Sequence, residues 1–170
     1  MKASLSRVPR TISRDKKSFT CCAPRFHIER ADWAGAIFST DAAIEIIRRT
    51  GERAAFPFAV RALALAKMGR PEEALNALQN ASNNIYSAQA CLELGAIEAA
   101  KTCLLKSYAA AWDDGPPYCY QWELDRCRAL LKKIGLPEPQ LPPYDPARLE
   151  PMPHEAEIRA AIASHAAATT

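Results

Sequence analysis

The sequence predicts an all-α fold, a short stack of helical hairpins with about six or seven helices in all. Two stretches are near-copies of each other, in which a turn glycine, Gly69 or Gly95, precedes a helix with small and large apolar residues at the same offsets. The stretch 120–134 carries apolar residues at successive offsets of four and three, the period of one helix face. The apolar fraction of 49% is rich in alanine, which favours helix without adding bulk.

A disordered basic tail, residues 1–27, is predicted to precede the helical domain. Residues 1–30 carry eight Lys/Arg against two Asp/Glu, so their net charge of +6 leaves −3 for the rest of a chain whose total is +3. The segment is rich in Ser and Thr and low in apolar periodicity, which is typical of disorder. Three interpretations stay open: a plain tail or a misplaced start at Met1, an arm that binds nucleic acid or anionic membrane, and an organellar targeting segment.

The helical domain is predicted to span residues 28–135. Its first helical residues are expected near Ala31. A second helix is expected at 41–50, where Ser39 or Thr40 can cap the exposed N–H groups.

The two near-copies are predicted to form two hairpins. The first has a helix at about 56–67 and, after Gly69, a helix that starts with Pro71 in its first turn. The inward positions of that second helix are expected to be Ala74, Leu75, Leu78 and Ala81. The second hairpin is compressed, with helices expected at about 85–93 and 97–112.

A capping helix is expected after the turn at 113–117, with Pro117 at its first position and Gly135 at its end. It carries the clearest apolar seam of the chain: Tyr120, Leu124, Cys127, Leu131 and Ile134.

Residues 136–170 are predicted to be a Pro-rich segment followed by a weak helix. Five prolines between Leu136 and Pro146 exclude a helix there, and Leu141 and Tyr144 are the expected anchors of an extended segment along the domain. The final stretch, 154–167, is alanine-rich with few large apolar residues.

Counted outward from its glycine, the first copy resembles a tetratricopeptide repeat (TPR). The matching positions are Phe58, Ala62, Leu65, Ala74, Leu78 and Ala81, while Arg61 stands where an apolar residue is usual. The second copy matches at Ala88, Cys91, Ala100 and Leu104, but Asn84 and Ser107 depart from the pattern. The two glycines lie 26 residues apart, fewer than the roughly 34 residues of a regular unit. The chain therefore resembles a TPR-like bacterial helical-repeat protein reduced to two units.

The resemblance implies a concave groove lined by the first helix of each pair. The candidate partner-binding residues are Phe56, Ala59, Leu63, Ala66, Lys67, Ile85, Gln89, Leu92 and Glu93. The basic and Asn side chains that clamp a peptide carboxylate in some TPR domains are absent, so an apolar or helical segment is the expected occupant. It comes from a protein or peptide partner, from a second copy of the chain, or from this chain through residues 31–50 or the Pro-rich tail.

No catalytic residue, cofactor or metal site is predicted. The pair Cys21-Cys22 with His27 lacks the second cysteine pair of a tetrahedral zinc site, and the six glycines form no phosphate-binding loop. Without a secretory signal, the six cysteines are interpreted as reduced cytoplasmic thiols. No apolar run approaches the roughly 18 residues of a transmembrane segment.

The sequence therefore predicts a non-enzymatic, cytoplasmic protein–protein interaction module. Nucleic acid is not expected to bind the helical domain, because the net charge outside the tail is negative. The alternative is an accessory protein that its basic N-terminal arm brings to nucleic acid or to an anionic membrane.

Overall fold

The computed structural model describes residues 24–51, 54–145, 147 and 154–168, and these residues confirm the all-α prediction with eight helices and no strand. The predicted basic tail lies outside the described residues as far as residue 23, and so do Cys21 and Cys22. Residues 24–29 form a short helix, called here the N-terminal helix.

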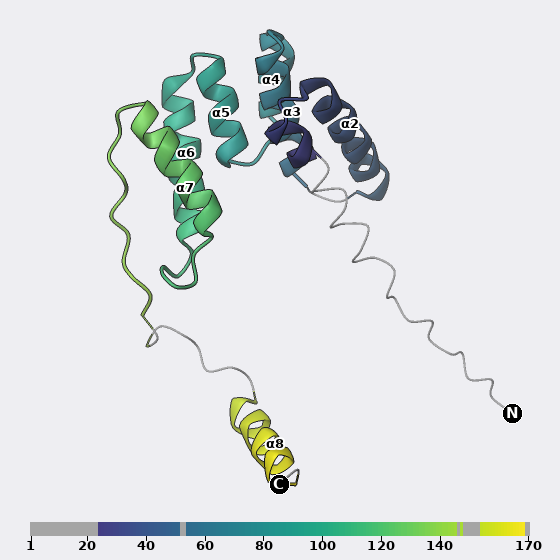
Figure 1. Ribbon diagram of the computed structural model, residues 1–170. Coiled ribbons are helices and arrows are strands. Elements are labelled where there is room, and N and C mark those ends of the chain that lie inside the picture. Colours follow the sequence, from purple (N-terminus) through teal and green to yellow (C-terminus); the bar gives the residue numbers. More distant parts are fainter. Residues whose placement is uncertain (1–23, 52–53, 146, 148–153, 169–170) are drawn as a thin grey trace, which may run out of the picture.

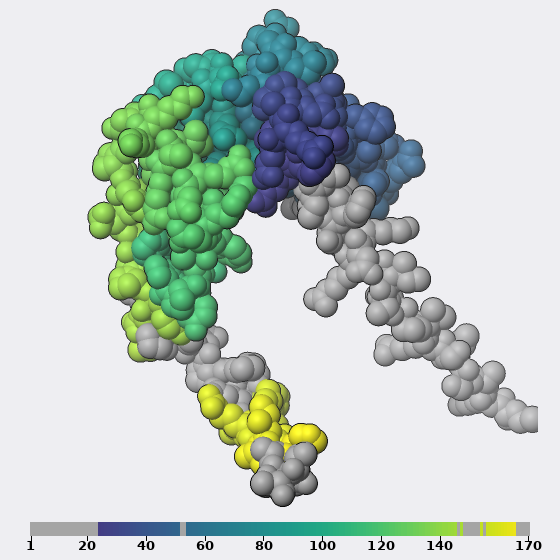
Figure 2. All heavy atoms as spheres, in the orientation of Figure 1, coloured from purple at the N-terminus to yellow at the C-terminus, as the bar shows by residue number. Residues whose placement is uncertain are grey.

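Seven longer helices follow in the described chain: α2 (Trp33–Thr50), α3 (Phe56–Lys67), α4 (Pro71–Leu78), α5 (Ile85–Glu93), α6 (Ile97–Trp112), α7 (Gln121–Lys133) and α8 (Glu155–Ala168). Helix α3 contacts α2, α4 and α5, and α5 in turn contacts α6 and α7. Figure 1 shows α2 to α7 as an arc, with the N-terminal helix on its inner side and α8 separate from it. In the space-filling view this arc is one continuous curved body, called here the arch (Figure 2).

The glycines that define the near-copies end their helices in the same way. Gly69 and Gly95 have φ of 71° and 72°, in the left-handed region that glycine adopts without steric cost. After each glycine, the next N–H donates to the carbonyl five residues earlier, at 3.0 Å in the first copy and 2.8 Å in the second. This bond satisfies a carbonyl at the helix end and directs the chain into the next helix.

The expected helix at 41–50 is the second half of a single helix, α2. The cap is Asp32, whose carboxylate accepts from the N–H of Gly35 at 2.9 Å, and neither Ser39 nor Thr40 acts as a cap. The Thr40 side chain is buried, and its hydroxyl donates to the carbonyl four residues earlier at 2.9 Å. Because this hydroxyl is satisfied within the helix, it does not interrupt α2.

Alanine makes up much of the core, with buried alanines in each of α2 to α6. Small side chains let these helices approach closely, and a few large residues fill the remaining space. The largest fully buried ones include Leu65, Ile85, Leu104 and Tyr108.

The predicted inward face of the helix after Gly69 is wrong at Leu75, and α4 ends at Leu78, before the predicted inward residue Ala81. Leu75 is 52% exposed, whereas Ala74 and Ala77 are buried. Ala74, Ala77 and Leu78 share one face at i, i+3 and i+4. Leu75 is rotated by about 100° from Ala74 around the helix axis, which carries it to the outer side.

Arg61, which departs from the TPR pattern, joins α3 to α2. Its Nε lies 2.6 Å from Oδ1 of Asp41, and its side chain is largely covered. An added helix packed on α3 therefore explains a charged residue at a position that is usually apolar.

Helix α7 begins later than the sequence predicts, at Gln121 rather than near Pro117. The seam residues Leu124, Cys127 and Leu131 are buried, while Tyr120, at the start of the seam, is 63% exposed. Residues 113–120 form a turn instead, and its Tyr120 N–H donates to the carbonyl of Ala111 at 2.7 Å.

The Pro-rich residues 136–144, called here the strap, lie back along α6 and α7 (Figure 1). The Tyr108 hydroxyl donates to Glu138 at 2.5 Å, and the indole N–H of Trp112 donates to the carbonyl of Pro142 at 2.8 Å. The Tyr144 ring meets Tyr118 edge-on at 4.7 Å between centroids. The strap is thus fixed at both of its ends.

Candidate interaction groove

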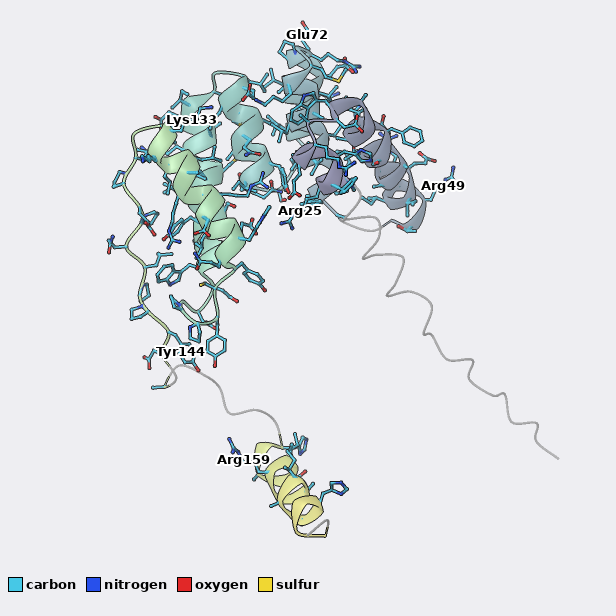
Figure 3. The ribbon with its side chains drawn as sticks, in the orientation of Figure 1. Arg25, Arg49, Glu72, Lys133, Tyr144 and Arg159 are labelled. Carbon is cyan, nitrogen blue, oxygen red and sulfur yellow. The ribbon has the colours of Figure 1, made fainter. Side chains whose placement is uncertain are left out.

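The inner side of the arch carries a pocket of about 230 Å³, called here the concave pocket. It lies where the C-terminal halves of α3, α5 and α7 face one another, next to the N-terminal helix. Its lining residues are Ile28, Trp33, Leu63, Lys67, Gln89, Leu92, Glu93, Arg126, Leu130 and Lys133. Figure 3 shows Lys133 at the end of α7, where the strap begins, and Arg25 on the N-terminal helix.

The nine residues predicted to line a groove divide into two sets. Five line the concave pocket: Leu63, Lys67, Gln89, Leu92 and Glu93. The other four lie deeper or to one side: Ala59 and Ile85 are buried in the core, and Phe56 and Ala66 are partly buried against it. Because α3 and α5 contact each other, residues on their facing sides belong to the core rather than to the pocket.

The floor of the pocket is apolar and its rim is basic. Leucines from three helices, Leu63, Leu92 and Leu130, contribute the apolar floor. Around them stand the cations of Lys67, Arg126 and Lys133 against the single carboxylate of Glu93.

One rim cation is neutralised and another is not. Nζ of Lys67 lies 2.6 Å from Oε1 of Glu93, which links α3 to α5 across the pocket. Lys133 has neither an ion pair nor a hydrogen bond to any residue that the structure describes. The rim therefore presents net positive charge to whatever enters the pocket.

Two buried oxygen atoms on α5 have no hydrogen-bond partner among the described residues. They are the amide oxygen of Gln89, which lines the pocket, and the hydroxyl of Tyr86, one turn earlier on α5. Burial raises the pKa of Tyr86, so its hydroxyl stays protonated. An orphaned buried group of this kind costs about 1–3 kcal/mol, which a donor entering the pocket would offset.

The N-terminal helix forms one wall of the pocket. Ile28 is buried in the common core. The guanidinium groups of Arg25 and Arg126 lie 3.5 Å and 4.4 Å from the ring centroid of Trp122 at the start of α7. Arg126 also approaches Glu29 at 3.9 Å. A cation–π contact and an ion pair thus join the N-terminal helix to α7.

The groove was expected to be occupied by residues 31–50 or by the Pro-rich tail of the same chain, and the structure corrects this expectation. Residues 24–33 border the pocket through Ile28 and Trp33, so only the start of the predicted segment 31–50 takes part. The Pro-rich strap contributes no lining residue, because it lies along α6 and α7.

The sequence analysis did not predict the pocket residues of α7, although the sequence contains a pattern that identifies one of them. Counting back two residues from the glycine that ends α3, α5 or α7 gives Lys67, Glu93 or Lys133, and all three line the pocket. Applying the register of the two near-copies to the capping helix would have found Lys133. Arg126 and Leu130 depend on how α7 packs and carry no such signal.

The described residues offer little for covalent or metal chemistry. They contain no group of three or more His, Cys, Asp or Glu side chains arranged to hold a metal ion. The described cysteines are free, and burial raises the pKa of Cys91 to about 11, which keeps this thiol protonated and unreactive. His27 pairs with Asp32 at 2.7 Å.

None of the helices in the described part of the chain combines the length and apolar character that crossing a bilayer requires. Comparison with protein-family models, with curated proteins and with solved structures found no match for this chain.

Proposed function

We propose that this protein is a non-enzymatic interaction module whose concave pocket holds an apolar, helical segment of a protein or peptide partner. The observation that carries the proposal is the pocket itself: an apolar floor, a basic rim with an unpaired Lys133, and a buried Gln89 oxygen without a donor. Each of these features is complemented by a group that the described residues do not supply.

The size of the pocket favours side chains over a free small molecule. Its volume of about 230 Å³ lies below the roughly 300–1,000 Å³ of typical small-molecule sites. A docked helix would place one or two large apolar side chains on the floor and leave its backbone outside. Carboxylates beside those side chains would meet the rim cations.

The free thiols support a cytoplasmic location, because a reducing compartment preserves them. The alternative role, recruitment to nucleic acid or anionic membrane, depends on the basic arm, most of which lies outside the described residues.

Quantitative pull-down from a cell lysate with Leu92→Arg tests the proposal. Leu92 lies at the pocket and is half-buried, so an arginine there blocks the floor with little effect on the core. Leu63 is only 2% exposed, which makes Leu63→Arg a test of folding as well as binding. Leu75→Arg, on the outer side of α4, is the matched control.

We expect that proteins recovered with wild type and with Leu75→Arg are not recovered with Leu92→Arg. Equal recovery with wild type and Leu92→Arg, at unchanged circular dichroism, would remove the groove from the proposal.

A further inference from the structure

A second groove lies between α2 and α4, and the proposed function does not use it. It has a volume of about 480 Å³ and is called here the outer groove. The α3 residues that line it, Phe58 and Arg61, are about half a turn of helix away from Leu63 and Lys67 of the concave pocket. The outer groove therefore lies on the opposite side of α3 from that pocket.

The two walls of the outer groove have the same spacing. Helix α2 contributes lining residues at positions 41, 44, 45 and 48, and α4 with its last turn contributes them at 73, 76, 77 and 80, each 32 residues later. Both helices pack against α3 and join it through short connections, so they run parallel to each other. In Figure 3 these walls are the helices that carry the labelled Arg49 and Glu72. Arg48 and Asn80 therefore occupy equivalent positions at one end of the groove.

The outer groove has one cation that is left without an anion. Each of its three carboxylates is paired with an arginine. The pairs are Asp41 with Arg61 at 2.6 Å, Glu73 with Arg70 at 2.6 Å and Glu45 with Arg49 at 2.9 Å. The guanidinium of Arg48, by contrast, forms no ion pair or hydrogen bond with the residues that the structure describes. A carboxylate is the group that complements its planar set of donors.

The α4 wall offers two side-chain amides at the repeat of an extended peptide. The exposed side chains of Asn76 and Asn80 have no hydrogen-bond partner in the described part of the chain. A primary amide both donates and accepts, as a peptide group does. Four residues span about 6 Å along a helix, and peptide groups on one edge of an extended chain recur every two residues, about 6.6 Å apart. The two amides can thus bond to alternate residues of one extended segment.

The floor of the outer groove is apolar. Ile44 and Ala77 are buried, and the ring of Phe58 is half-buried between the two walls. Side chains of an extended chain point alternately to its two faces. Every second side chain would therefore contact this floor, while those between them would face outward, where the exposed Arg48 can reach them.

We propose that the outer groove binds an extended, acidic peptide segment of another protein. The main chain of this segment bonds to the amides of Asn76 and Asn80, and its inward apolar side chains contact Phe58 and Ile44. An outward Asp or Glu side chain pairs with Arg48. This surface is separate from the concave pocket, so the inference goes beyond the proposed function and does not depend on it.

NMR titration of the full chain with a defined peptide tests the inference. The probe is a heptapeptide of alternating valine and glutamate with both ends blocked, because valine favours an extended chain. We expect saturable shifts of the side-chain amide signals of Asn76 and Asn80, which single alanine variants assign. A peptide with glutamine in place of glutamate is expected to bind about five- to tenfold more weakly, because hydrogen bonds to charged groups are the stronger ones. No saturable shift, or equal affinity for both peptides, overturns the inference.

Variants of exposed residues locate the binding. We expect Asn76→Ala/Asn80→Ala to lose the glutamate peptide and Arg48→Gln to bind both peptides with equal affinity. The controls are Gln79→Ala, which removes an amide outside the groove, and Lys106→Gln, which removes one positive charge from α6. Both controls should bind as wild type does. A loss of the same size in the controls would show attraction without a site and overturn the inference.

Transferred nuclear Overhauser effects show the conformation of the bound peptide. Strong contacts between each Hα and the following amide proton are expected for an extended chain, whereas strong contacts between successive amide protons would show a bound helix and overturn the inference. Leu92→Arg, in the concave pocket, is expected to leave the titration unchanged. The pull-down and the titration therefore fail separately: loss of the peptide interaction alone overturns the outer groove, and loss of the pull-down result alone overturns the proposed function.

Discussion

At the scale of single residues, Gly115 holds the turn between α6 and α7 against the strap. Its φ is +87°, and a Cβ at this position would lie 2.9 Å from both Nε1 of Trp112 and the backbone N of Tyr144. Both a left-handed backbone and a close approach therefore require glycine here.

We predict that Gly115→Ala lowers the free energy of unfolding more than Gly135→Ala does. Gly135 also has positive φ, but a Cβ there would meet no atom within 4 Å beyond its chain neighbours, so only the backbone strain applies. Such strain costs about 1–3 kcal/mol, and the clash at Gly115 adds to it. Urea unfolding of the two variants makes the comparison, and equal losses would show that the strap yields without cost.

Glu138 gives the strap a pH-dependent anchor. The hydrogen bond from Tyr108 and the guanidinium of Arg128 lower the pKa of Glu138 below its ordinary value. A depressed pKa in the folded state means that this contribution is complete above the unfolded pKa and is lost as pH falls through the folded one.

We expect Glu138→Gln to flatten the acid limb of the stability curve. The variant should be less stable than wild type at neutral pH, and the difference should shrink as the pH falls through the acid range. Urea midpoints over a pH series measure this. A constant difference at every pH would show that Glu138 acts through its shape rather than its charge.

At the scale of elements, the N-terminal helix is attached by two buried side chains, Pro24 and Ile28, and by the contacts of Arg25 and Glu29 with α7. Exposed cation–π contacts contribute only about 0.5–1 kcal/mol each. The helix should therefore open locally while the rest of the stack stays folded.

Trp122→Ala is predicted to increase hydrogen exchange at residues 24–29 without changing exchange in α5. Tyr120→Ala is the matched control, because Tyr120 is exposed in the same region and forms none of these cation–π contacts. Unchanged exchange at residues 24–29 in the tryptophan variant would assign the attachment to the buried Pro24 and Ile28.

The elements also show which features sequence reasoning reaches. Helix ends at Gly69 and Gly95 were predictable, because a left-handed residue at a helix end is a local requirement. The continuity of α2 through Thr40 was not, because a hydroxyl can either cap a new helix or bond back within an existing one.

The residues of the candidate site also separate into those that a local sequence pattern predicts and those that depend on tertiary packing. The pocket residues of α3 and α5 follow from the register of two near-copies, whereas Ile28 and Arg126 enter through tertiary packing that no local pattern encodes. The prediction that Leu75 of α4 faces the core was wrong for a related reason. Both Leu75 and Ala77 are good helix formers, and only the contact of α4 with α3 decides which of them is buried.

At the scale of the whole molecule, the stability of the arch depends on the strap as well as on its alanine-rich core. Alanine lets α3 and α5 approach closely but buries little apolar surface per residue. The strap covers Tyr108 and Trp112 on α6, and its Leu136 and Leu141 pack against the core. It therefore belongs to the folded unit rather than to a tail.

Truncation after Gly135 is predicted to lower the melting temperature far more than truncation after Ala147. Both remove α8, so their difference isolates the strap. The strap accepts three side-chain hydrogen bonds, from Tyr108 and Arg128 to Glu138 and from Trp112 to Pro142, at about 1 kcal/mol each. It also adds the partial burial of two leucines at up to about 1.5–3 kcal/mol each. A loss of several kcal/mol corresponds to roughly 10 °C or more in a chain of this size. Calorimetry of the two truncated proteins measures it, and equal melting temperatures would mean that the arch holds its shape without the strap.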